Sequence, residues 1–503
     1  MNLLTDKWMS VVRQSGKIEY VAPRDIFDDE DPPIEFCWGR SEFDIANLQF
    51  MIGLLHAFLP PAPGKYHGYK TKGITPEQFD GATKDFVHCF NFTGDGPLFM
   101  QDNNIDKTPK SVKNISKIFM EALSEQGEKR NLDITQHKTQ PRQLSLPVTA
   151  IAHYTRQQLG TNRSGGFAGP LAGYRVFSRE VGSTTLADMC MLNTPDGTAI
   201  NISDIPSIFT WMNGEKRGVP ILDRVQPDDG NKISPAVWFI VHNRSVFGDV
   251  SEGHCDFTGC DTLVIRDMWR ARGGERCVYG AWNNPAIFYH YKDKQEKEKI
   301  PAGMYPINNL KLEEGKLTFD NYVGMLFSST KQRACETVSG YVKSRVGGNI
   351  DIVIGGFEYN QAEVLSTISE THSIPIDKLS DRDLFVVAGI VEGIGKMTYT
   401  TQRKITDLYT TNSKASVFMI KRELIEEIEP HFIEFLSNIS TLTDASQKLH
   451  TQVRRICMSK FNHHMDIVVP NTTSESRMPV IFGLDKQMGT SLSSKKIKQL
   501  FGL

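Results

Sequence analysis

The stretch VVAGIVEGIGKM, residues 386–397, repeats apolar side chains at intervals of three and four. This spacing puts them on one face of an α-helix. Similar spacing recurs in residues 424–435 and 449–457, and a fourth helical segment is expected after Ser476. Consecutive amphipathic helices bury their apolar faces against one another. We therefore predict a C-terminal four-helix bundle over residues 373–503.

Two shorter elements are predicted near the N-terminus. Residues 3–12 and 18–21 flank a Gln-Ser-Gly-Lys turn, an order that is typical of a β-hairpin. Ser41 occupies the position of a helix N-cap, with Asp44 three residues later, and apolar residues follow at helical spacing. Pro60 should end this helix.

The rest of the chain ahead of the bundle alternates between helical and strand-like patterns. Residues 150–158 favour a helix, whereas apolar runs at 236–241 and 350–354 favour strands, with many Gly and Pro between them. We therefore predict an α+β protein, with one large irregular mixed domain over residues 1–372 followed by the bundle.

The overall charge is nearly balanced. The 503 residues include 57 Lys and Arg against 59 Asp and Glu, a formal net charge of −2. This excludes a uniformly basic nucleic-acid coat protein but is compatible with a local basic stripe. The eight cysteines are scattered, which favours reduced thiols. Without a signal-peptide pattern or roughly eighteen consecutive apolar residues, we expect a cytoplasmic protein with no membrane partner.

Common catalytic motifs are absent. The sequence contains no GxxxxGK[ST], HExxH or GxSxG pattern, so the usual phosphate-binding, zinc-protease and hydrolase sites lack their residues. One enzyme hypothesis stays open, a metal-dependent nuclease or hydrolase that uses His463, His464 and Asp466. Adjacent histidines on a helix point about 100° apart, so they would need ligands from elsewhere. A surface histidine pair is the alternative.

The best zinc candidate combines His254, Cys255, Cys260 and Cys277. The gap between Cys255 and Cys260 is at the edge of the spacing that structural zinc sites use, and a second close cysteine pair is missing. Buried or unused thiols are therefore the favoured interpretation.

Two glycine-rich segments could approach nucleic acid. In Asn-Arg-Ser-Gly-Gly-Phe, Gly165 and Gly166 would let main-chain groups come close to a base edge or to another backbone, and a plain turn is the alternative. In Gly-Gly-Phe-Glu-Tyr-Asn-Gln, Asn360 and Gln361 can pair with base edges at a loop tip, or cap a helix that begins near Ala362.

Two basic segments could contact phosphate. Arginines alternate with Trp and Gly from Arg266 to Arg276, and Lys138 and Arg142 lie in a polar, Gln-rich stretch. Arginine in a loop can enter a groove or clamp a phosphate. A solvated loop explains the same pattern.

Taken in this order, these segments resemble the CasA family, the large subunit of the type I-E CRISPR surveillance complex Cascade. The resemblance covers essentially the whole chain, including its length and terminal bundle, and Gly-Gly-Phe-x-x-Asn-Gln-Ala is its most specific piece. The matching stretches are Asn2–Trp8, Pro97–Gln101, Thr149–Ala152, Gly165–Phe167 and Ile354–Ala362.

The resemblance implies a subunit that is not an enzyme and needs no cofactor. Members of that family sit beside the handle of the guide RNA, read the short motif flanking the target (the PAM) as a duplex, and start to open it, while guide pairing reads the sequence. The implied partners are other Cascade subunits, guide RNA, double-stranded target DNA and a helicase-nuclease effector. Both the large mixed domain and the C-terminal bundle would support recruitment of the effector.

The family's two main DNA contacts map onto four residues. A glycine loop approaches the PAM from the minor groove, whose donor and acceptor pattern is degenerate, and it falls on Gly165 and Gly166. A hairpin wedge lies against the base pairs next to the PAM and falls on Asn360 and Gln361. The glutamine pushes between the strands, so groove and backbone contacts must offset the cost of unstacking.

Two further family elements map less directly. A lysine that reaches into the minor groove has no direct counterpart, so Arg270 or Arg272 would have to serve. The loop beside the RNA handle falls on a stretch that includes His137, Lys138 and Arg142.

The chain also departs from the family pattern. Some members hold zinc through two Cys-x-x-Cys pairs. Here the first pair falls on Ser145 and Val148, and only Cys255 of the second remains, so we predict no metal. Glu358, two residues before the wedge asparagine, is acidic where a relative has a basic residue, which disfavours a phosphate contact there.

Overall fold

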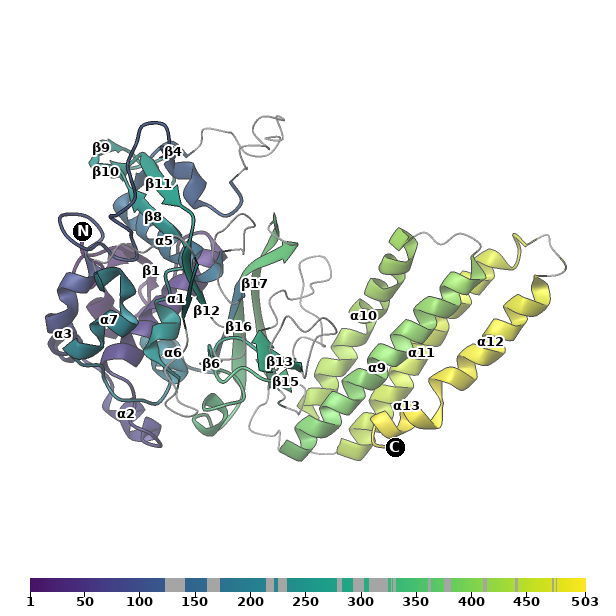
Figure 1. The fold of residues 1–503 in the computed structure, drawn as a ribbon. Coiled ribbons are helices and arrows are strands. Elements are labelled where there is room, and N and C mark those ends of the chain that lie inside the picture. The colour runs from purple at the N-terminus through teal and green to yellow at the C-terminus, as the bar shows by residue number, and fades with distance from the viewer. Residues whose placement is uncertain are drawn as a thin grey trace. The chain divides into compact units, whose positions relative to one another are not determined.

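The computed structural model of the chain forms two compact units (Figure 1). The first comprises Met1–Leu310, Thr330–Arg345 and Asp351–His372, and the second comprises Lys311–Ser329, Val346–Ile350 and Ser373–Leu503. The structure describes residues 1–122, 141–160, 172–213, 221–224, 233–277, 283–292, 303–306, 324–326, 328, 332–360, 363–374, 381–409, 414–438, 442–472, 475 and 477–503.

The first unit begins with the predicted hairpin. Strand β1 (Met9–Arg13) pairs antiparallel with β2 (Ile18–Val21) and, on its other side, with β3 (Pro33–Phe36). The strand starts later than the apolar pattern suggested, because residues 3–8 pack elsewhere. Leu3 donates its main-chain N–H to the carbonyl of Phe90, and the Trp8 indole donates to the Leu3 carbonyl.

Helix α1 (Ser41–Phe58) is the central element of this unit and is buried on nearly every side. Its Phe50 makes edge contacts with five other rings, those of Trp8, Phe90, Phe99, Tyr154 and Phe239. The predicted N-cap is off by one residue. Arg40 is the N-cap, Ser41 is the first helical residue, and the Asp44 carboxylate accepts from the Trp38 N–H instead of completing a capping pattern.

The predicted strand at 236–241 is wrong. Pro235–Trp238 form a 3-10 helix (η6) that packs on α1. A Cβ on Gly53 of α1 would lie 2.8 Å from the Trp238 Cβ, so only glycine permits this approach. An apolar run that is buried all round has no periodicity to separate strand from helix.

The remaining helices of the first unit are short apart from α5, which confirms the helix predicted at 150–158. They are α2 (Tyr66–Lys72), α3 (Pro76–Thr83), α5 (Leu146–Leu159), α6 (Leu186–Asn193) and α7 (Ile205–Ile208), with 3-10 turns η1 (Pro23–Phe27), η2 (Lys84–Phe90), η3 (Ile115–Ile118), η4 (Ile202–Asp204), η5 (Thr210–Asn213) and η7 (Val342–Ser344).

Small sheets surround this helical core. Their hydrogen-bonded orders are β5 (Leu144–Ser145), β10 (Asp261–Ile265), β9 (Ser251–His254); β4 (Lys113–Asn114), β11 (Asp267–Ala271), β8 (Arg244–Phe247); β12 (Gly274–Cys277), β7 (Ile221–Arg224); β14 (Gly303–Pro306), β13 (Tyr289–Lys292), β15 (Gln332–Arg333); and β17 (Glu363–Ile374), β16 (Ile350–Asn360), β6 (Tyr174–Glu180). The α+β prediction is confirmed, and so is the strand at 350–354.

The second unit is the predicted helical bundle. Its helices are α9 (Asp381–Leu408), α10 (Lys414–Ser437), α11 (Leu442–Val468), α12 (Met478–Leu492) and α13 (Lys495–Leu500). Helix α9 packs against each of the others, and α10 and α12 both contact α11 (Figure 1). The predicted apolar stripes form its core, with Ile390, Ile394, Met397, Leu424, Ile428, Phe432, Leu449 and Val453 at most 2% exposed.

Within the described ranges, no helix is both long enough and apolar enough to cross a membrane.

Candidate nucleic-acid interface

The predicted wedge residues lie at the end of a long strand. Strand β16 ends at Asn360, the next described residue is Glu363, and β17 begins there, so Gln361 lies outside the described residues. The alternative of a helix near Ala362 is wrong, because residues 363–374 form a strand beside β16. Further down β16, the Glu358 carboxylate accepts from the Ser366 hydroxyl of β17 at 2.7 Å.

The segment carrying Gly165 and Gly166 lies outside the described residues, but both of its flanks are described. One flank is the C-terminal end of α5, and the other leads through Gly173 into β6. The Phe357 N–H of β16 donates to the Gly173 carbonyl at 2.8 Å. Gly356 has a φ of 137°, and a Cβ there would lie 2.3 Å from the same carbonyl oxygen. The contact therefore depends on glycine.

The two candidate groove arginines differ in their surroundings. The segment from Arg266 to Arg276 is not a loop, since it contains strands β11 and β12. Arg270 on β11 is half-buried and donates to the Asn243 side-chain oxygen at 3.2 Å. Arg272 is exposed in the turn between the strands, and its carbonyl accepts from Arg244 at 3.0 Å. The turn continues through Gly273, whose φ is 97°.

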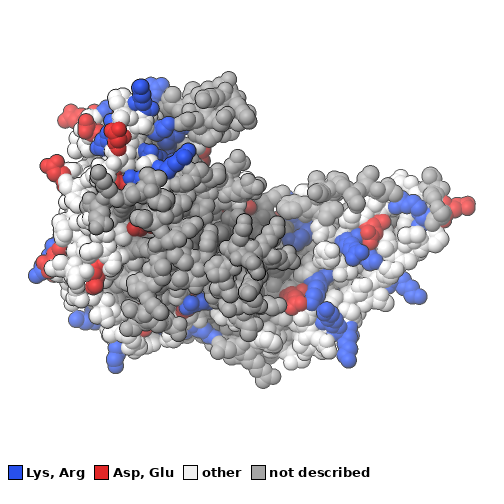
Figure 2. Space-filling view, in the orientation of Figure 1, with Lys and Arg blue, Asp and Glu red and all other residues white. Residues whose placement is uncertain are grey.

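Other basic residues lie beside strand β11. Lys113 on β4 is in register with Met268 on β11, and the Lys107 ammonium lies 5.8 Å from the centre of the Trp269 ring. The Trp269 indole N–H donates to the Thr108 carbonyl, which holds this segment against β11. Figure 2 shows blue Lys and Arg atoms gathered over the region where Figure 1 labels β4 and β11.

Of the predicted RNA-handle residues, His137 and Lys138 lie outside the described residues, whereas Arg142 is described and exposed. The Asp256 carboxylate accepts from the main-chain N–H groups of Arg142 and Gln143, at 2.5 and 3.1 Å. The Asp256 N–H donates back to the Gln143 carbonyl at 3.1 Å. Sequence reasoning missed Asp256, because its partners are 114 and 113 residues earlier in the chain.

Of the zinc candidates, the side chains of His254, Cys255 and Cys260 are described, whereas that of Cys277 lies outside the described part of the structure. The Cys255 thiol is buried and its sulfur accepts from the Ser145 N–H at 3.2 Å, whereas Cys260 is exposed. Burial alone would raise the pKa of Cys255, but hydrogen bonds from Thr258 and Ser145 together outweigh it and lower the pKa. His254 pairs instead with Asp261. In the described part of the chain, no group of three or more His, Cys, Asp or Glu is arranged to hold a metal ion.

The residues of the enzyme hypothesis lie on α11 in two different settings. The Tyr409 hydroxyl and His464 Nδ1 share a hydrogen bond of 2.8 Å, and burial is the main cause of the lowered pKa of His464. His463 and Asp466 line an open groove beside Arg454 and Arg455. Two guanidinium groups in that groove disfavour a bound cation.

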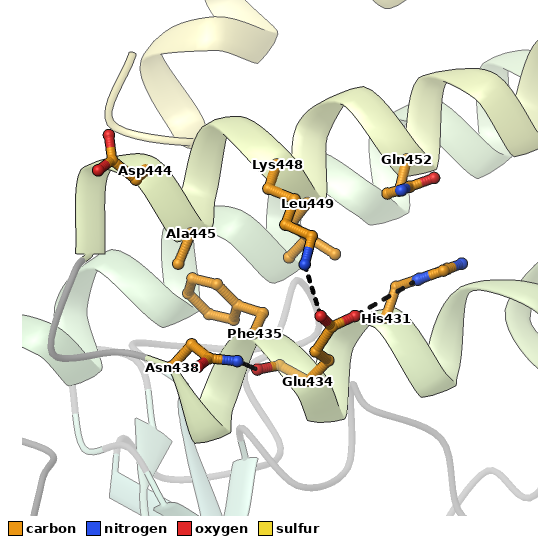
Figure 3. A pocket seen from close by; sticks show the side chains of 9 residues that line it. All are labelled: His431, Glu434, Phe435, Asn438, Asp444, Ala445, Lys448, Leu449 and Gln452. Carbon is orange, nitrogen blue, oxygen red and sulfur yellow. Dashed lines mark hydrogen bonds and ion pairs between the residues drawn. The ribbon is translucent and has the colours of Figure 1, made fainter.

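A second hollow lies between α10 and α11 and has a volume of about 320 Å³ (Figure 3). Phe435, Ala445 and Leu449 form its apolar part. The Glu434 carboxylate binds Lys448 at 2.6 Å and approaches His431 at 4.0 Å, and Lys448 lowers the Glu434 pKa. At the rim, Glu434 and Lys448 neutralise each other, and Asp444 is a further, exposed carboxylate among the lining residues.

Comparisons with known proteins bear on the whole chain. The family model described as CRISPR-associated protein Cse1 matches residues 2–459. Several solved structures share the fold, including the following three. Thermobifida fusca Cse1 has a TM-score of 0.70 at 13% identity, covering 100% of this chain and 98% of that one. Acidimicrobium ferrooxidans Cse1 has 0.67 at 12%, covering 100% and 98%. A chain of a structure titled "CRISPR RNA-guided surveillance complex" has 0.58 at 12%, covering 98% and 99%. No curated protein matches significantly.

Proposed function

The chain belongs to the CRISPR-associated Cse1 family, and we propose that it is the non-catalytic large subunit of a type I-E CRISPR RNA-guided surveillance complex, Cascade. In this role it recognises the PAM in duplex DNA and helps to open the duplex for pairing with the guide RNA. It also supports recruitment of the helicase-nuclease effector. The other Cascade subunits, the guide RNA and the target duplex are its partners.

The observation that carries this proposal is the contact between Phe357 and Gly173, N–H to carbonyl at 2.8 Å. Gly173 belongs to a flank of the segment with Gly165 and Gly166, and Phe357 lies three residues before Asn360. The second flank of the Gly165 segment thus leads into β6, a neighbour in the sheet of β16, which ends at Asn360. An element that recognises the PAM and an element that opens the neighbouring base pairs must lie close together, because the PAM and those base pairs are adjacent on the DNA.

Arg272 is the better candidate for the groove-reaching residue. Its side chain is exposed and its carbonyl is held by Arg244, so the turn is fixed while the guanidinium stays accessible. Arg270 already donates to Asn243. An exposed arginine on a fixed turn can enter a minor groove or bind phosphate with little loss of conformational freedom.

Arg142 would contact the handle of the guide RNA. Asp256 holds its main chain, and the side chain is exposed. With a net charge of −2 the chain provides a few local contacts, and most of the affinity for DNA must come from the assembled complex.

The alternative, a metal-dependent nuclease or hydrolase, is tested by incubating the purified chain with duplex DNA and Mg²⁺ or Mn²⁺. We expect no cleavage, because the His464 imidazole is bonded to Tyr409 and the neighbouring groove is lined by Arg454 and Arg455. Robust cutting that disappears in His464→Ala would overturn the non-catalytic assignment.

PAM recognition is tested with the complex reconstituted on a guide RNA and a pool of target duplexes with randomised flanking bases. Sequencing the bound fraction gives the preferred flanks. Gly165→Asp should reduce the preference by about tenfold, because a carboxylate beside the groove repels phosphate. Gly81→Asp is the matched control, since it adds the same charge at an exposed position on α3 with open space around it. An unchanged preference in Gly165→Asp and Gln361→Ala would remove the recognition role.

A further inference from the structure

We propose that Tyr359 and Arg175 are positioning residues that couple the glycine loop to the wedge, so that PAM reading and duplex opening depend on one packed junction. The inference rests on the proposed function, because it assumes that both elements touch DNA. The junction itself is built from described residues at the two flanks of the segment 161–171 and on β16.

Tyr359 contacts both flanks with one side chain. Its hydroxyl donates to the carbonyl of Leu159, the last residue of α5. Its ring covers Gly173 on the other flank, where a Cβ would lie 2.3 Å from the Tyr359 Cε2. The side chain is 7% exposed and directly precedes Asn360 in the chain. A movement of either flank would therefore displace Tyr359, the residue directly before Asn360 of the wedge.

Arg175 ties the same two flanks to each other. Its Nη1 donates to the carbonyls of Ala172 and Tyr174 at 3.0 and 2.7 Å, and its Nη2 donates to the Gln158 carbonyl at 2.7 Å. The residue is 2% exposed. Burying a guanidinium is costly, and the three carbonyls that accept from Nη1 and Nη2 offset part of that cost, which favours keeping them in place around the charge.

Together the two side chains close a ring of contacts around the base of the loop. Arg175 binds both flanks through its guanidinium, Tyr359 contacts both flanks through its hydroxyl and ring, and the Phe357 N–H binds the Gly173 carbonyl. Such a junction has little room to shift, because Gly173 and Gly356 leave no space for added atoms. A fixed junction keeps the loop and the wedge in the relative geometry that the duplex requires.

The most selective test is Tyr359→Phe, which removes the hydrogen bond to Leu159 and keeps the ring against Gly173. In the reconstituted complex, the preference for PAM-bearing duplex and the rate of duplex opening should fall together, each by about fivefold, the worth of one buried hydrogen bond. The control is Tyr341→Phe, which removes a comparable hydrogen bond to the Asn193 carbonyl away from the junction. If Tyr359→Phe leaves both quantities within twofold, or changes them no more than Tyr341→Phe does, the coupling is refuted.

A double-mutant cycle separates this inference from the proposed function. Where two residues act through one junction, the combined loss in Tyr359→Phe with Gln361→Ala is smaller than the product of the separate losses. A combined loss equal to the product of the separate losses would refute the coupling. If Gln361→Ala and Gly165→Asp are themselves silent, the proposed function fails instead. Thermal unfolding of each variant identifies any loss that arises from misfolding, and Arg175→Lys, which retains the charge but not the fork of donors, gives a second readout of the same junction.

Discussion

Arg244 and Asp102 form a buried ion pair, Nε to Oδ2 at 2.7 Å, with side chains 7% and 1% exposed. The same guanidinium donates through Nη1 to the carbonyl of Arg272 at 3.0 Å. Asp102, together with Arg244 on β8, thus supports the turn that contains Arg272. Because the guanidinium is charged and fixed, its bonds are stronger than neutral ones.

Asp102→Asn should destabilise the chain by about 3 kcal/mol, because it leaves the Arg244 charge buried without its partner. Urea unfolding measures the change. The affinity of the complex for PAM-bearing duplex should fall as well, since the Arg272 turn loses its support.

Asp261→Asn is the control for this change, because its partner His254 is exposed and such surface pairs contribute little. Equal losses of stability in both variants would contradict the role given to the Asp102 pair.

Acid should destabilise the fold through two buried histidines. Burial lowers the pKa of His56 to about 3 and that of His153 to about 4, from an ordinary value of 6.5. A histidine whose pKa is lower in the folded state contributes stability above the unfolded pKa. This contribution is lost as the pH falls towards the folded pKa, at up to about 1.4 kcal/mol per pH unit for each group.

His56→Gln removes one of these groups and leaves an acceptor for the Trp238 indole, which donates to His56 Nδ1 at 2.9 Å. The loss of unfolding free energy between pH 7 and pH 5 should then be about 2 kcal/mol smaller than in the original chain. Denaturant titrations at both pH values measure it. An identical pH dependence would contradict this account, because it would mean that the pKa of His56 is the same in the folded and unfolded states.

Asp256→Ala should weaken binding of the guide-RNA handle by about three- to fivefold, because the main-chain N–H groups of Arg142 and Gln143 each lose a charge-assisted hydrogen bond. Filter binding or fluorescence anisotropy with a labelled guide RNA measures the affinity. Asp249→Ala removes the same charge from another exposed position and should have no such effect. If both variants bind RNA more tightly, only the net charge matters and the anchoring role is wrong.

The bundle could be predicted because its signal is local. Ile390, Ile394 and Met397 follow one another at helical spacing, and each is buried in the structure. The strand predicted at 236–241 failed for the opposite reason. Its conformation depends on Gly53, which is far away in sequence and lets Trp238 pack directly on α1.

In the candidate site, too, features with a local sequence signal could be predicted, whereas contacts between remote residues could not. Gly165, Asn360 and Gln361 stood out because their residue types suit contact with nucleic acid. The residues that support them did not stand out, because their partners are remote. Tyr359 and Leu159 are 200 residues apart, so no local pattern predicts their hydrogen bond.

Opening of the first base pair beside the PAM tests the central claim most directly. A 2-aminopurine at that position brightens when it unstacks, and the flanking sequence is the one selected from the randomised pool. The complex with the original chain should raise the fluorescence on PAM-bearing duplex and not on a duplex with a scrambled flank. The Gln361→Ala complex, with guide-RNA binding intact, should open the pair at least about tenfold more slowly. Opening at the original rate in Gln361→Ala would contradict the account.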